Sequence, residues 1–471
     1  MRVLLVWPKA RTDPEWGGDL GAVAEPLALE YIGTVARRRG HEVRVLDLRL
    51  ASGDLDSVLQ TFAPDLVGVT AFSMHVSAAK AVLRRARAAR PHCVTVVGGH
   101  HATLLPQDFF VPEVDFVVCG EGTGKFGQLL DRLSSGDAAP DIAGVWRRGL
   151  PNPRPRLALV SATAAPDVRT GSESCSFVHG GPEEAFDITQ IPLPDRSLTA
   201  SFRQHYFIDW MKPVALLRST VGCPFRCSFC SLWTIMSGRY HKRPVDDVVT
   251  ELASISEEFV FLIDDEAFID GKRMKALAAA IRESGIRKRL FAYCRIDTMI
   301  RNQDVLRDWR AIGLERLLVG IDAITDSDID EYHKDCTVAE IERGLQVAEE
   351  IGIQVFAQFV VNTNYTKQDF VRLRRFVERH RIRYPSFTVL TPLPGTQMLG
   401  DMSGVLVRQA DGRPNWDYFD TQNAVTATRL PADEFRREYR GLYRVFKASY
   451  SEFHHYHTMP GDVAFTAVSQ T

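Results

Sequence analysis

The first 150 residues alternate short apolar runs with longer stretches in which apolar residues recur at helical spacing. Residues 27–39 and 76–89 have this helical spacing. The apolar runs are rich in Val and Leu and have the length of strands: 3–6, 43–46, 66–70, 94–97 and 116–118. This alternation predicts an α/β domain with a doubly wound, Rossmann-like parallel sheet, which binds ligands at the carboxyl ends of its strands.

A second alternation of strands and helices begins at about residue 214 and continues to about 395. The expected strands are 214–219, 259–263, 291–294, 316–319, 354–361 and 386–390. Six parallel strands with helices between them predict a partial TIM-type (β/α)6 barrel, whose functional residues stand at the carboxyl ends of the strands. The tail shows a helical pattern around 431–450 and ends in His454-His455-Tyr456-His457, which we interpret as a solvated tail.

The region between these two alternations is rich in Pro, Ser, Gly and Ala, and residues 162–181 have little periodicity. Such composition predicts a linker. We therefore expect one domain at 1–150, a linker at 151–200, a second domain at 201–396 and a helical region at 397–471.

Charge and hydropathy exclude several classes of protein. The 57 Lys and Arg nearly balance the 59 Asp and Glu, so no basic field is present to hold a nucleic acid. No run approaches the roughly 18 apolar residues of a membrane span, and the first residues lack the pattern of a secretory signal. Isolated cysteines at 93, 119, 175, 294 and 336 agree with a reducing compartment. We expect a cytoplasmic protein without a transmembrane segment.

Three cysteines within eight residues are the most informative chemistry in the chain. Cys223, Cys227 and Cys230 have the spacing Cys-x3-Cys-x2-Cys. A four-iron cluster is normally held by four thiolates, so three leave one iron open for a small molecule. Structural zinc needs four ligands, and only the lone His241 stands nearby. Three buried packing thiols are the other alternative. We interpret the triplet as metal ligands of a 4Fe-4S cluster.

With Phe229 before the last cysteine, this motif resembles the signature of the radical S-adenosylmethionine (SAM) enzymes. In that family the open iron chelates the amino and carboxylate groups of SAM. The reduced cluster then splits SAM into methionine and a 5′-deoxyadenosyl radical. The resemblance implies that Cys223, Cys227 and Cys230 are the catalytic residues.

Acidic residues follow the second strand of the predicted barrel. Asp264, Asp265 and Glu266, completed by Phe268, resemble the Asp-Asp-x-x-Phe element of cobalamin-dependent members. Their position matches the stretch that holds the amino group of SAM, and carboxylates accept hydrogen bonds from an ammonium. The alternative is an acidic turn that caps a helix.

Other strand ends also carry candidates for SAM binding. Arg295 and Asp297 suit a carboxylate and ribose hydroxyls, and an internal ion pair is the alternative. Asp322 stands in the family's Gly-x-Glu-Ser position, as a shorter acid. Thr391 opens a stretch that matches the family's Pro-Leu-Pro-Gly-Thr loop near adenine and substrate. The family's Gly-x-Pro-Gly-Glu-Thr turn is absent at 362–366.

Glycines follow the strands of the first domain, where a tight turn is the alternative to a ligand site. No Gly-x-Gly-x-x-Gly follows the first strand, so a dinucleotide site has little support. Residues 96–103, 118–122 and 25–32 resemble the cobalamin-binding domain found ahead of many radical SAM domains. The resemblance implies cobalamin contacts from Pro26, Ser73, Gly98, Gly99, His100, Thr103, Gly120, Glu121 and Gly122.

The Asp-x-His-x-x-Gly loop that supplies a histidine to cobalt in other B12 proteins is absent, and residues 71–75 read Ala-Phe-Ser-Met-His instead. The resemblance therefore implies a cobalt without a histidine ligand and a benzimidazole tail in the Gly98-Gly99 pocket. We interpret His75, His100 and His101 as packing residues.

The two regions together resemble cobalamin-dependent radical SAM methyltransferases, and residues 206–213 and 237–240 are similar to the hopanoid C-3 methylases. Such enzymes use one SAM to methylate cobalamin and another to make the radical that activates a carbon atom. The resemblance implies a small-molecule or lipid substrate and an electron donor of flavodoxin or ferredoxin type. The alternatives are a cyclase or ring-rearranging enzyme with the same cofactors, and a cobalamin or iron–sulfur sensor without turnover.

Overall fold

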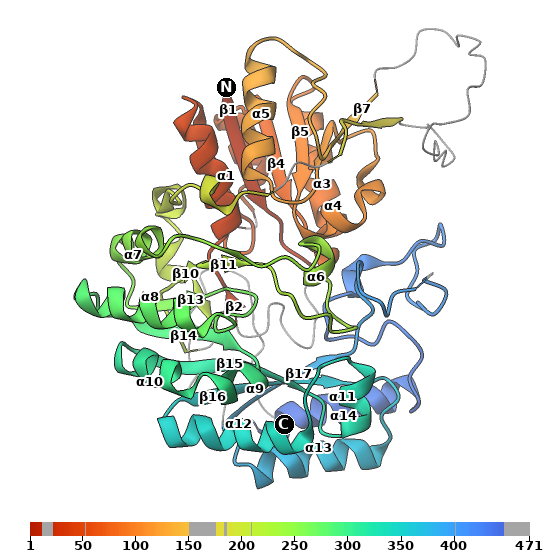
Figure 1. Cartoon of the computed structure of the whole chain (residues 1–471). Coiled ribbons are helices and arrows are strands. Elements are labelled where there is room, and N and C mark those ends of the chain that lie inside the picture. The colour runs from red at the N-terminus through yellow and green to blue at the C-terminus, as the bar shows by residue number, and fades with distance from the viewer. Residues whose placement is uncertain are drawn as a thin grey trace. The chain divides into compact units, whose positions relative to one another are not determined.

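The computed structural model describes residues 1–11, 22–51, 53–149, 176–182, 186–208, 210–400 and 402–446. The chain divides into two compact units (Figure 1). The first comprises Met1–Lys9 and Ala28–Phe186, and the second comprises Ala10–Leu27 and Asp187–Thr471. A short segment near the amino terminus thus belongs to the second unit, where β2 (Ala22–Val23) pairs antiparallel with β9 (Phe207–Ile208).

The first unit is built on a seven-stranded sheet in the order β3-β1-β4-β5-β6-β7-β8. Its strands are β1 (Arg2–Trp7), β3 (Glu42–Asp47), β4 (Leu66–Thr70), β5 (Val94–Gly98), β6 (Phe116–Val118), β7 (Val145–Arg148) and β8 (Phe177–His179). The first five are parallel, as the sequence predicts, and the edge strands β7 and β8 are antiparallel. Strand β8 lies inside the predicted linker, so part of that segment extends the sheet.

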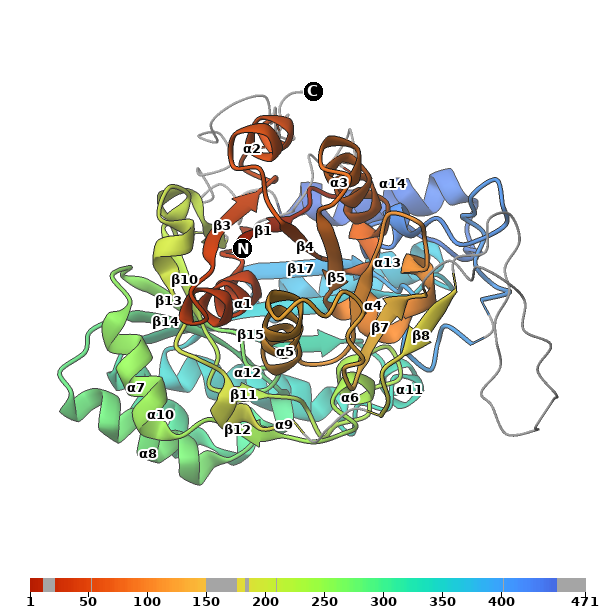
Figure 2. The same ribbon diagram turned by 90° about the horizontal axis from the view of Figure 1, so that it is seen from above.

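Helices cover both faces of this sheet, as expected for a doubly wound fold. Figure 2 shows α1 and α5 on one face and α2 and α3 on the other. The helical segments are α1 (Leu27–Arg38), α2 (Leu55–Thr61), η1 (Ser73–His75), α3 (Val76–Ala89), α4 (His100–Leu104), η2 (Pro106–Phe109) and α5 (Thr123–Ser134).

The second unit contains a six-stranded parallel sheet whose strands follow one another in chain order. They are β10 (Val214–Leu217), β13 (Phe259–Leu262), β14 (Arg289–Cys294), β15 (Leu314–Asp322), β16 (Gln354–Val361) and β17 (Tyr384–Val389). A small antiparallel pair, β11 (Thr220–Val221) with β12 (His241–Lys242), follows β10. This order is that of the predicted partial barrel.

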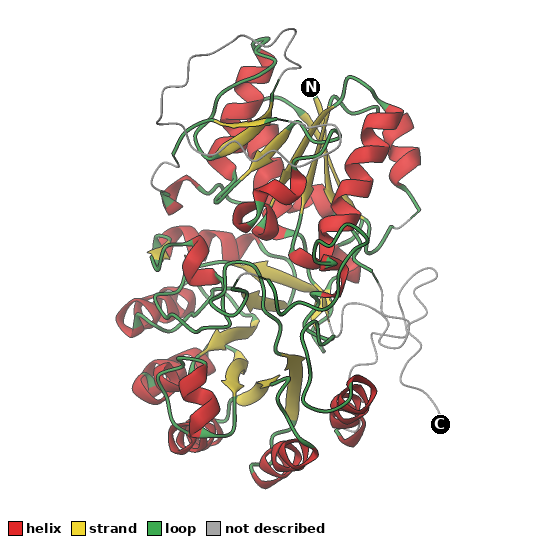
Figure 3. Ribbon diagram, turned by 90° about the vertical axis from the view of Figure 1, so that its right-hand side faces the viewer, coloured by secondary structure: helices red, strands yellow, loops and turns green. Residues whose placement is uncertain are grey.

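Helices lie outside these strands (Figure 3). They are α6 (Leu232–Ile235), α7 (Val245–Ser254), α8 (Gly271–Glu283), α9 (Ile296–Arg301), α10 (Gln303–Ala311), α11 (Asp326–Glu331), α12 (Val338–Ile351), α13 (Lys367–Arg379) and α14 (Ala432–Val445). The short helical turns are η3 (Ile188–Gln190), η4 (Arg196–Thr199), η5 (Arg203–His205) and η6 (Trp416–Tyr418). The predicted tail helix corresponds to α14, and residues 447–471 lie outside the described residues.

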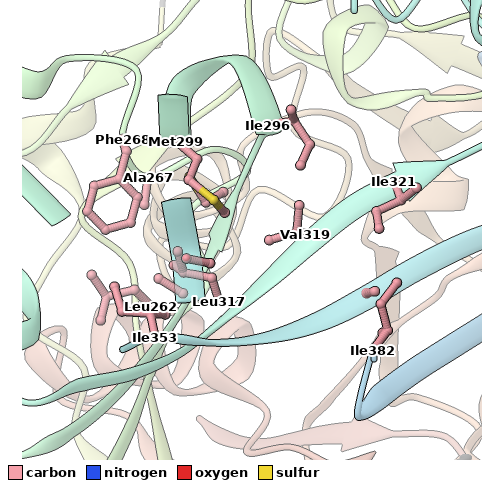
Figure 4. Packing of buried hydrophobic residues seen from close by; sticks show 14 of the residues in the cluster. Leu262, Ala267, Phe268, Ile296, Met299, Leu317, Val319, Ile321, Ile353 and Ile382 are labelled. Carbon is pink, nitrogen blue, oxygen red and sulfur yellow. The ribbon is translucent and has the colours of Figure 1, made fainter. Parts of the chain in front are cut away.

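The hydrophobic core of the second unit lies between the strands and these helices. Alternate residues of β15 pack there with Phe268 and Met299 (Figure 4): Leu317, Val319 and Ile321. Because successive side chains of a strand point to opposite faces, the intervening residues lie on the inner face. There the rings of Phe261 and Phe291 stack with centroids 4.6 Å apart. The carboxyl ends of the strands are left to carry function.

Candidate functional site

The loop that carries the three cysteines begins at Gly222, directly after β11. Its φ of +92° is left-handed, and a Cβ there would lie 2.1 Å from the carbonyl oxygen of Arg239. Only glycine fits this position. The main-chain N–H of Gly222 donates to Oδ2 of Asp265 at 2.7 Å. The acidic segment after β13 therefore holds the first turn of the cysteine loop.

The rest of the loop is fastened by two other segments. Ser228 donates its main-chain N–H to the carbonyl of Tyr332 and its hydroxyl to that of Glu331, both at 3.0 Å. The carbonyl of Ser228 accepts from Gln397 N–H at 3.1 Å, and Thr234 Oγ1 donates to the carbonyl of Gly395 at 2.7 Å. The predicted Pro-Leu-Pro-Gly-Thr loop is thus bonded to the cysteine loop.

The three sulfur atoms receive N–H donors. The main-chain N–H groups of Phe225 and Leu232 lower the pKa of Cys223 and Cys230, against the effect of burial, and Arg295 Nη1 lies 3.6 Å from Cys227 Sγ. Burial raises the pKa of Cys223 to about 12 and that of Cys230 to about 11. Burial disfavours the thiolate form because it removes water from the sulfur. The iron ions of an iron–sulfur cluster would stabilise the thiolates in place of water, so buried cysteines with N–H groups nearby suit such a cluster.

The same thiols suit a single metal ion less well. Among the residues that the structure describes, no three His, Cys, Asp or Glu side chains are grouped closely enough to hold one ion. In a four-iron cluster each thiolate binds a different iron atom, so its three ligands need not converge on a point. The donor set therefore fits the predicted cluster.

The three acids after β13 have different surroundings. Asp264 is fully buried and accepts from Ser219 and Thr220, and burial raises its pKa. Glu266 accepts from the main-chain N–H of Arg295 at 2.6 Å, and burial raises its pKa to about 8. Asp265 is the partly exposed member of the three. Of the three acids, it is therefore the one with the most solvent access.

The other residues predicted to contact SAM form hydrogen bonds within the protein. Arg295 Nε donates to Asp297 Oδ1 at 2.8 Å, which is the internal ion pair considered as the alternative. The hydroxyl of Thr391 donates to the carbonyl of Val389 at 2.9 Å. The structure places Arg295 and Asp297 beside the cysteine loop, and it places Thr391 at the end of the last strand.

Asp322 pairs with a lysine that the sequence analysis did not select. The Nζ of Lys334 donates to Asp322 Oδ2, and also to the carbonyl of Gly320 at 2.6 Å. Lys334 is 4% exposed, and burial lowers its pKa to about 8. It stands in an irregular segment after α11, and no motif distinguishes it from a surface lysine.

In the first unit, Thr103 joins two of the glycine loops. Its Oγ1 donates to the carbonyl of Gly99 and accepts from the N–H of Gly120, both at 2.9 Å. Gly99 has a φ of +98°, and a Cβ there would lie 2.6 Å from Thr70 Oγ1. The carboxyl ends of β4, β5 and β6 therefore meet in a tight backbone arrangement.

The three histidines considered as possible cobalt ligands, His75, His100 and His101, have surroundings within the protein. His101 is buried, and its ring nitrogens contact Ser73 Oγ at 3.0 Å and Asp108 Oδ2 at 2.9 Å. His75 Nδ1 accepts from the main-chain N–H of Phe72 at 3.4 Å. Burial lowers the pKa of His75 to about 4, as it does for His100. These surroundings support packing roles.

Of the expected cobalamin contacts, most stand at the carboxyl edge of the first sheet. Ser73 follows β4, Gly98 is the last residue of β5, and Gly99, His100 and Thr103 come after it, while Gly120 and Gly122 follow β6. Glu121 accepts from the N–H and the hydroxyl of Thr123 at 2.8 and 2.6 Å. Pro26 belongs to the second unit.

Two family models match these units. The B12 binding domain matches residues 17–130, and the Radical SAM superfamily matches residues 217–377. Together with the cysteine loop, they define a radical SAM enzyme with a cobalamin-binding domain. These matches confirm the predicted cofactors, namely a 4Fe-4S cluster, SAM and cobalamin.

The hopanoid C-3 methylase of Methylococcus capsulatus is 30% identical over 420 residues, which cover 88% of this chain and 75% of the methylase. The chain therefore belongs to the cobalamin-dependent radical SAM methyltransferases. An anaerobic magnesium-protoporphyrin IX monomethyl ester cyclase of Rubrivivax gelatinosus is 25% identical over 85% of this chain and 70% of the cyclase.

Solved structures share the fold. The radical SAM methyltransferase TsrM from Kitasatospora setae, solved with cobalamin and a [4Fe-4S] cluster, has a TM-score of 0.67 and 19% identity. The similarity covers 94% of this chain and 90% of TsrM. Both predicted domain types are thereby confirmed. No helix in the part of the chain that the structure describes is long and apolar enough to cross a membrane.

Proposed function

We propose that the protein transfers a methyl group from SAM, by way of cobalamin, to an unactivated carbon atom of a small-molecule or lipid substrate. The observation that carries this proposal is the 30% identity to a hopanoid C-3 methylase along 88% of the chain. A reducing compartment such as the cytoplasm suits three thiols that must bind iron. A match to methyltransferases also favours an enzyme over the sensor.

In this proposal the domain at 1–150 holds cobalamin and the domain at 201–396 holds the cluster and SAM. When bound, these groups supply a methyl group and a radical that removes hydrogen, and the protein supplies binding and orientation. Cys223, Cys227 and Cys230 bind the iron atoms. Asp265 accepts the ammonium of SAM, and its second role is to hold Gly222.

The electron that activates the cluster comes from an external donor of flavodoxin or ferredoxin type. The inner face of the barrel carries a layer of buried aromatic side chains. Phe261, Phe291, Phe356 and Tyr384 pack there, and Arg316 lies with its Cζ 3.4 Å from the ring centroid of Trp210. Phe291, Phe356 and Tyr384 stand in the first half of their strands, so this packed layer lies away from the carboxyl ends, where the acceptor is expected to bind.

A second candidate function is ring formation without methyl transfer. The 25% identity to a magnesium-protoporphyrin cyclase over 85% of the chain supports it. The two functions share the cluster and cobalamin. They differ in whether the methyl carbon of SAM leaves SAM and enters the product.

The experiment uses the full chain, purified without oxygen and reconstituted with iron, sulfide and hydroxocobalamin. SAM labelled with deuterium in its methyl group is added with dithionite, with and without a hopanoid that lacks a C-3 methyl group. The expected results are label in the cobalamin fraction without any acceptor, label in the recovered hopanoid when it is present, and 5′-deoxyadenosine that disappears in Cys227→Ala. Deoxyadenosine without labelled cobalamin would favour the cyclase.

A further inference from the structure

One side chain reaches from the barrel to a cluster ligand. Arg295 follows β14, and its guanidinium lies over the ring of Phe225, with Cζ 3.7 Å from the ring centroid. From there Nη1 lies 3.6 Å from Cys227 Sγ. Neither Cys223 nor Cys230 has a charged donor among the hydrogen bonds that the described residues make. Among the described residues, Cys227 is therefore the one cluster ligand with a hydrogen-bond contact to a cation.

Three groups fix the guanidinium in this position. Its Nε donates to Asp297 Oδ1 at 2.8 Å, its Nη2 donates to the carbonyl of Lys334 at 2.7 Å, and Phe225 covers one face. The Arg295 side chain is only 11% exposed. Because each nitrogen of the planar Arg295 guanidinium has a partner, the group has little freedom to turn away from Cys227 Sγ. The N–H···S contact is therefore a fixed feature of the fold.

The segment that supplies this carbonyl has an unusual backbone. His333 and Asp335, on either side of Lys334, have φ values of +49° and +54°, and Asp322 has +63°. Left-handed conformations of residues other than glycine are costly, and they persist where the surrounding structure requires them. Here they turn the carbonyl of Lys334 to Arg295 and its ammonium to Asp322.

Lys334 carries a second buried cation. Its Nζ donates to Asp322 Oδ2 and to the carbonyl of Gly320, and the residue is 4% exposed. Arg295 and Lys334 thus each have a carboxylate partner of their own, Asp297 and Asp322.

Positive charge and hydrogen bonds at the sulfur atoms stabilise the more negative oxidation state of an iron–sulfur cluster. We propose that Arg295, positioned by Lys334, stabilises the reduced cluster through its contact with Cys227 and so sets the potential at which the cluster accepts an electron. The step is the gain of one electron from a low-potential donor, with no bond made or broken in the protein. The proposal rests on the cluster assignment and is independent of the methyl acceptor.

The test is a redox titration of the reconstituted full chain in the absence of SAM. Dithionite and mediators set the solution potential, and electron paramagnetic resonance reports the reduced cluster. At a fixed potential near the wild-type midpoint, the ratio of reduced to oxidised cluster should be at least tenfold lower in Arg295→Gln than in wild type. For one electron this corresponds to a midpoint potential that is lower by about 59 mV. Arg295→Lys keeps the positive charge but lacks the planar guanidinium, so its midpoint potential should lie between those of wild type and Arg295→Gln.

Arg301→Gln is the matched control, because Arg301 is an exposed arginine at the far end of α9 and should leave the midpoint unchanged. An Arg295→Gln protein with full iron and sulfide content and the wild-type midpoint would overturn the proposal. If Arg295→Gln fails to retain the cluster, Arg295→Lys decides, because it keeps the charge but loses the planar fork that reaches the sulfur. Its midpoint should lie below that of wild type, and an unchanged or higher midpoint would refute the proposal.

The readout also separates this inference from the proposed function. The midpoint is measured without SAM or acceptor, so a protein that transfers no methyl group can still show the shift. Conversely, labelled cobalamin with an unchanged Arg295→Gln midpoint would support methyl transfer and reject the role of Arg295.

Discussion

The carboxylate of Asp264 accepts hydrogen bonds from both the main-chain N–H and the hydroxyl of Ser219, each at 2.6 Å. A third bond comes from the N–H of Thr220 at 2.7 Å. Asp264 therefore fixes the chain where β10 ends and the approach to the cysteine loop begins. An acid that the sequence analysis selected for SAM thus has a structural function.

Asp264→Ala should destabilise the second unit and weaken iron retention. The substitution leaves buried donors of Ser219 and Thr220 without an acceptor, at a cost of about 2–4 kcal/mol. Urea unfolding of the iron-free protein measures the cost, and iron per chain after gel filtration measures retention. Asp264→Asn keeps one acceptor oxygen, so its free energy of unfolding should fall by about half as much as that of Asp264→Ala. Equal stability of Asp264→Ala and wild type would contradict this role.

Gly99→Ala should lower the free energy of unfolding of the first unit, whereas Gly98→Ala should not. A Cβ at Gly99 would lie 2.6 Å from Thr70 Oγ1 and 2.8 Å from the main-chain nitrogen of Ala71, at a φ of +98°. At Gly98 the closest atom is the carbonyl oxygen of Val118 at 3.5 Å, an ordinary contact. We expect Gly99→Ala to cost about 2 kcal/mol or more from conformation and crowding.

Thermal unfolding of both variants without cobalamin, and bound cobalamin after desalting, are the measurements. Gly99→Ala should lose stability and cobalamin together. A Gly98→Ala variant that is as stable as wild type but binds no cobalamin would place the ligand directly against Gly98. Wild-type behaviour of Gly99→Ala would show that the loop relaxes around the added methyl group.

The strands could be predicted because their Val- and Leu-rich runs are continuous and buried. The strand order of a parallel fold then brings the segments after β13, β14 and β15 to the same end as the cysteine loop. The sequence does not indicate which of the carboxylates at this end form hydrogen bonds within the protein. Asp264 and Asp265 are adjacent in sequence, yet one fastens β10 and the other remains partly exposed.

Long-range ion pairs also escaped the sequence analysis. Glu25 is buried in the second unit, where it accepts from Arg203 Nη1 at 2.8 Å and from the main-chain N–H of Leu216 at 2.6 Å. These partners are almost 200 residues away in the chain, so no local pattern indicates them. For this reason the segment before α1 was assigned with the cobalamin-binding region rather than with the barrel.

Acid should destabilise the first unit through His75. Its pKa falls from an ordinary 6.5 to about 4 on folding, so the unfolded chain binds the proton more readily. The stability that depends on neutral His75 is complete above pH 6.5 and is lost as the pH falls toward 4. Between pH 7.5 and 5 the loss should be about 2 kcal/mol.

His75→Asn removes the titrating group and keeps an acceptor for the N–H of Phe72. Urea unfolding, followed by circular dichroism at both pH values, should therefore show a smaller pH effect in this variant than in wild type. Other histidines titrate in both proteins, so the difference between the two isolates His75. An identical pH effect in the two proteins would assign acid sensitivity to other groups.

Asp322→Asn should be among the most destabilising single substitutions in the barrel. Asn adopts the left-handed φ of +63° as readily as Asp does, so backbone strain does not change. The loss leaves the ammonium of Lys334 buried without its carboxylate, and breaking such a pair costs about 3–5 kcal/mol. Urea unfolding measures this cost, and Asp330→Asn, an exposed position on α11, should stay within about 0.5 kcal/mol of wild type.

The double variant Asp322→Asn with Lys334→Met tests the cause. Removing both charges leaves no buried ion unpaired, so the double variant should be more stable than Asp322→Asn alone. If the double variant is instead less stable by the sum of the two single effects, the pair does not couple and Asp322 acts through other contacts. Recovery of stability would show that Asp322 is present to neutralise Lys334, rather than to bind SAM.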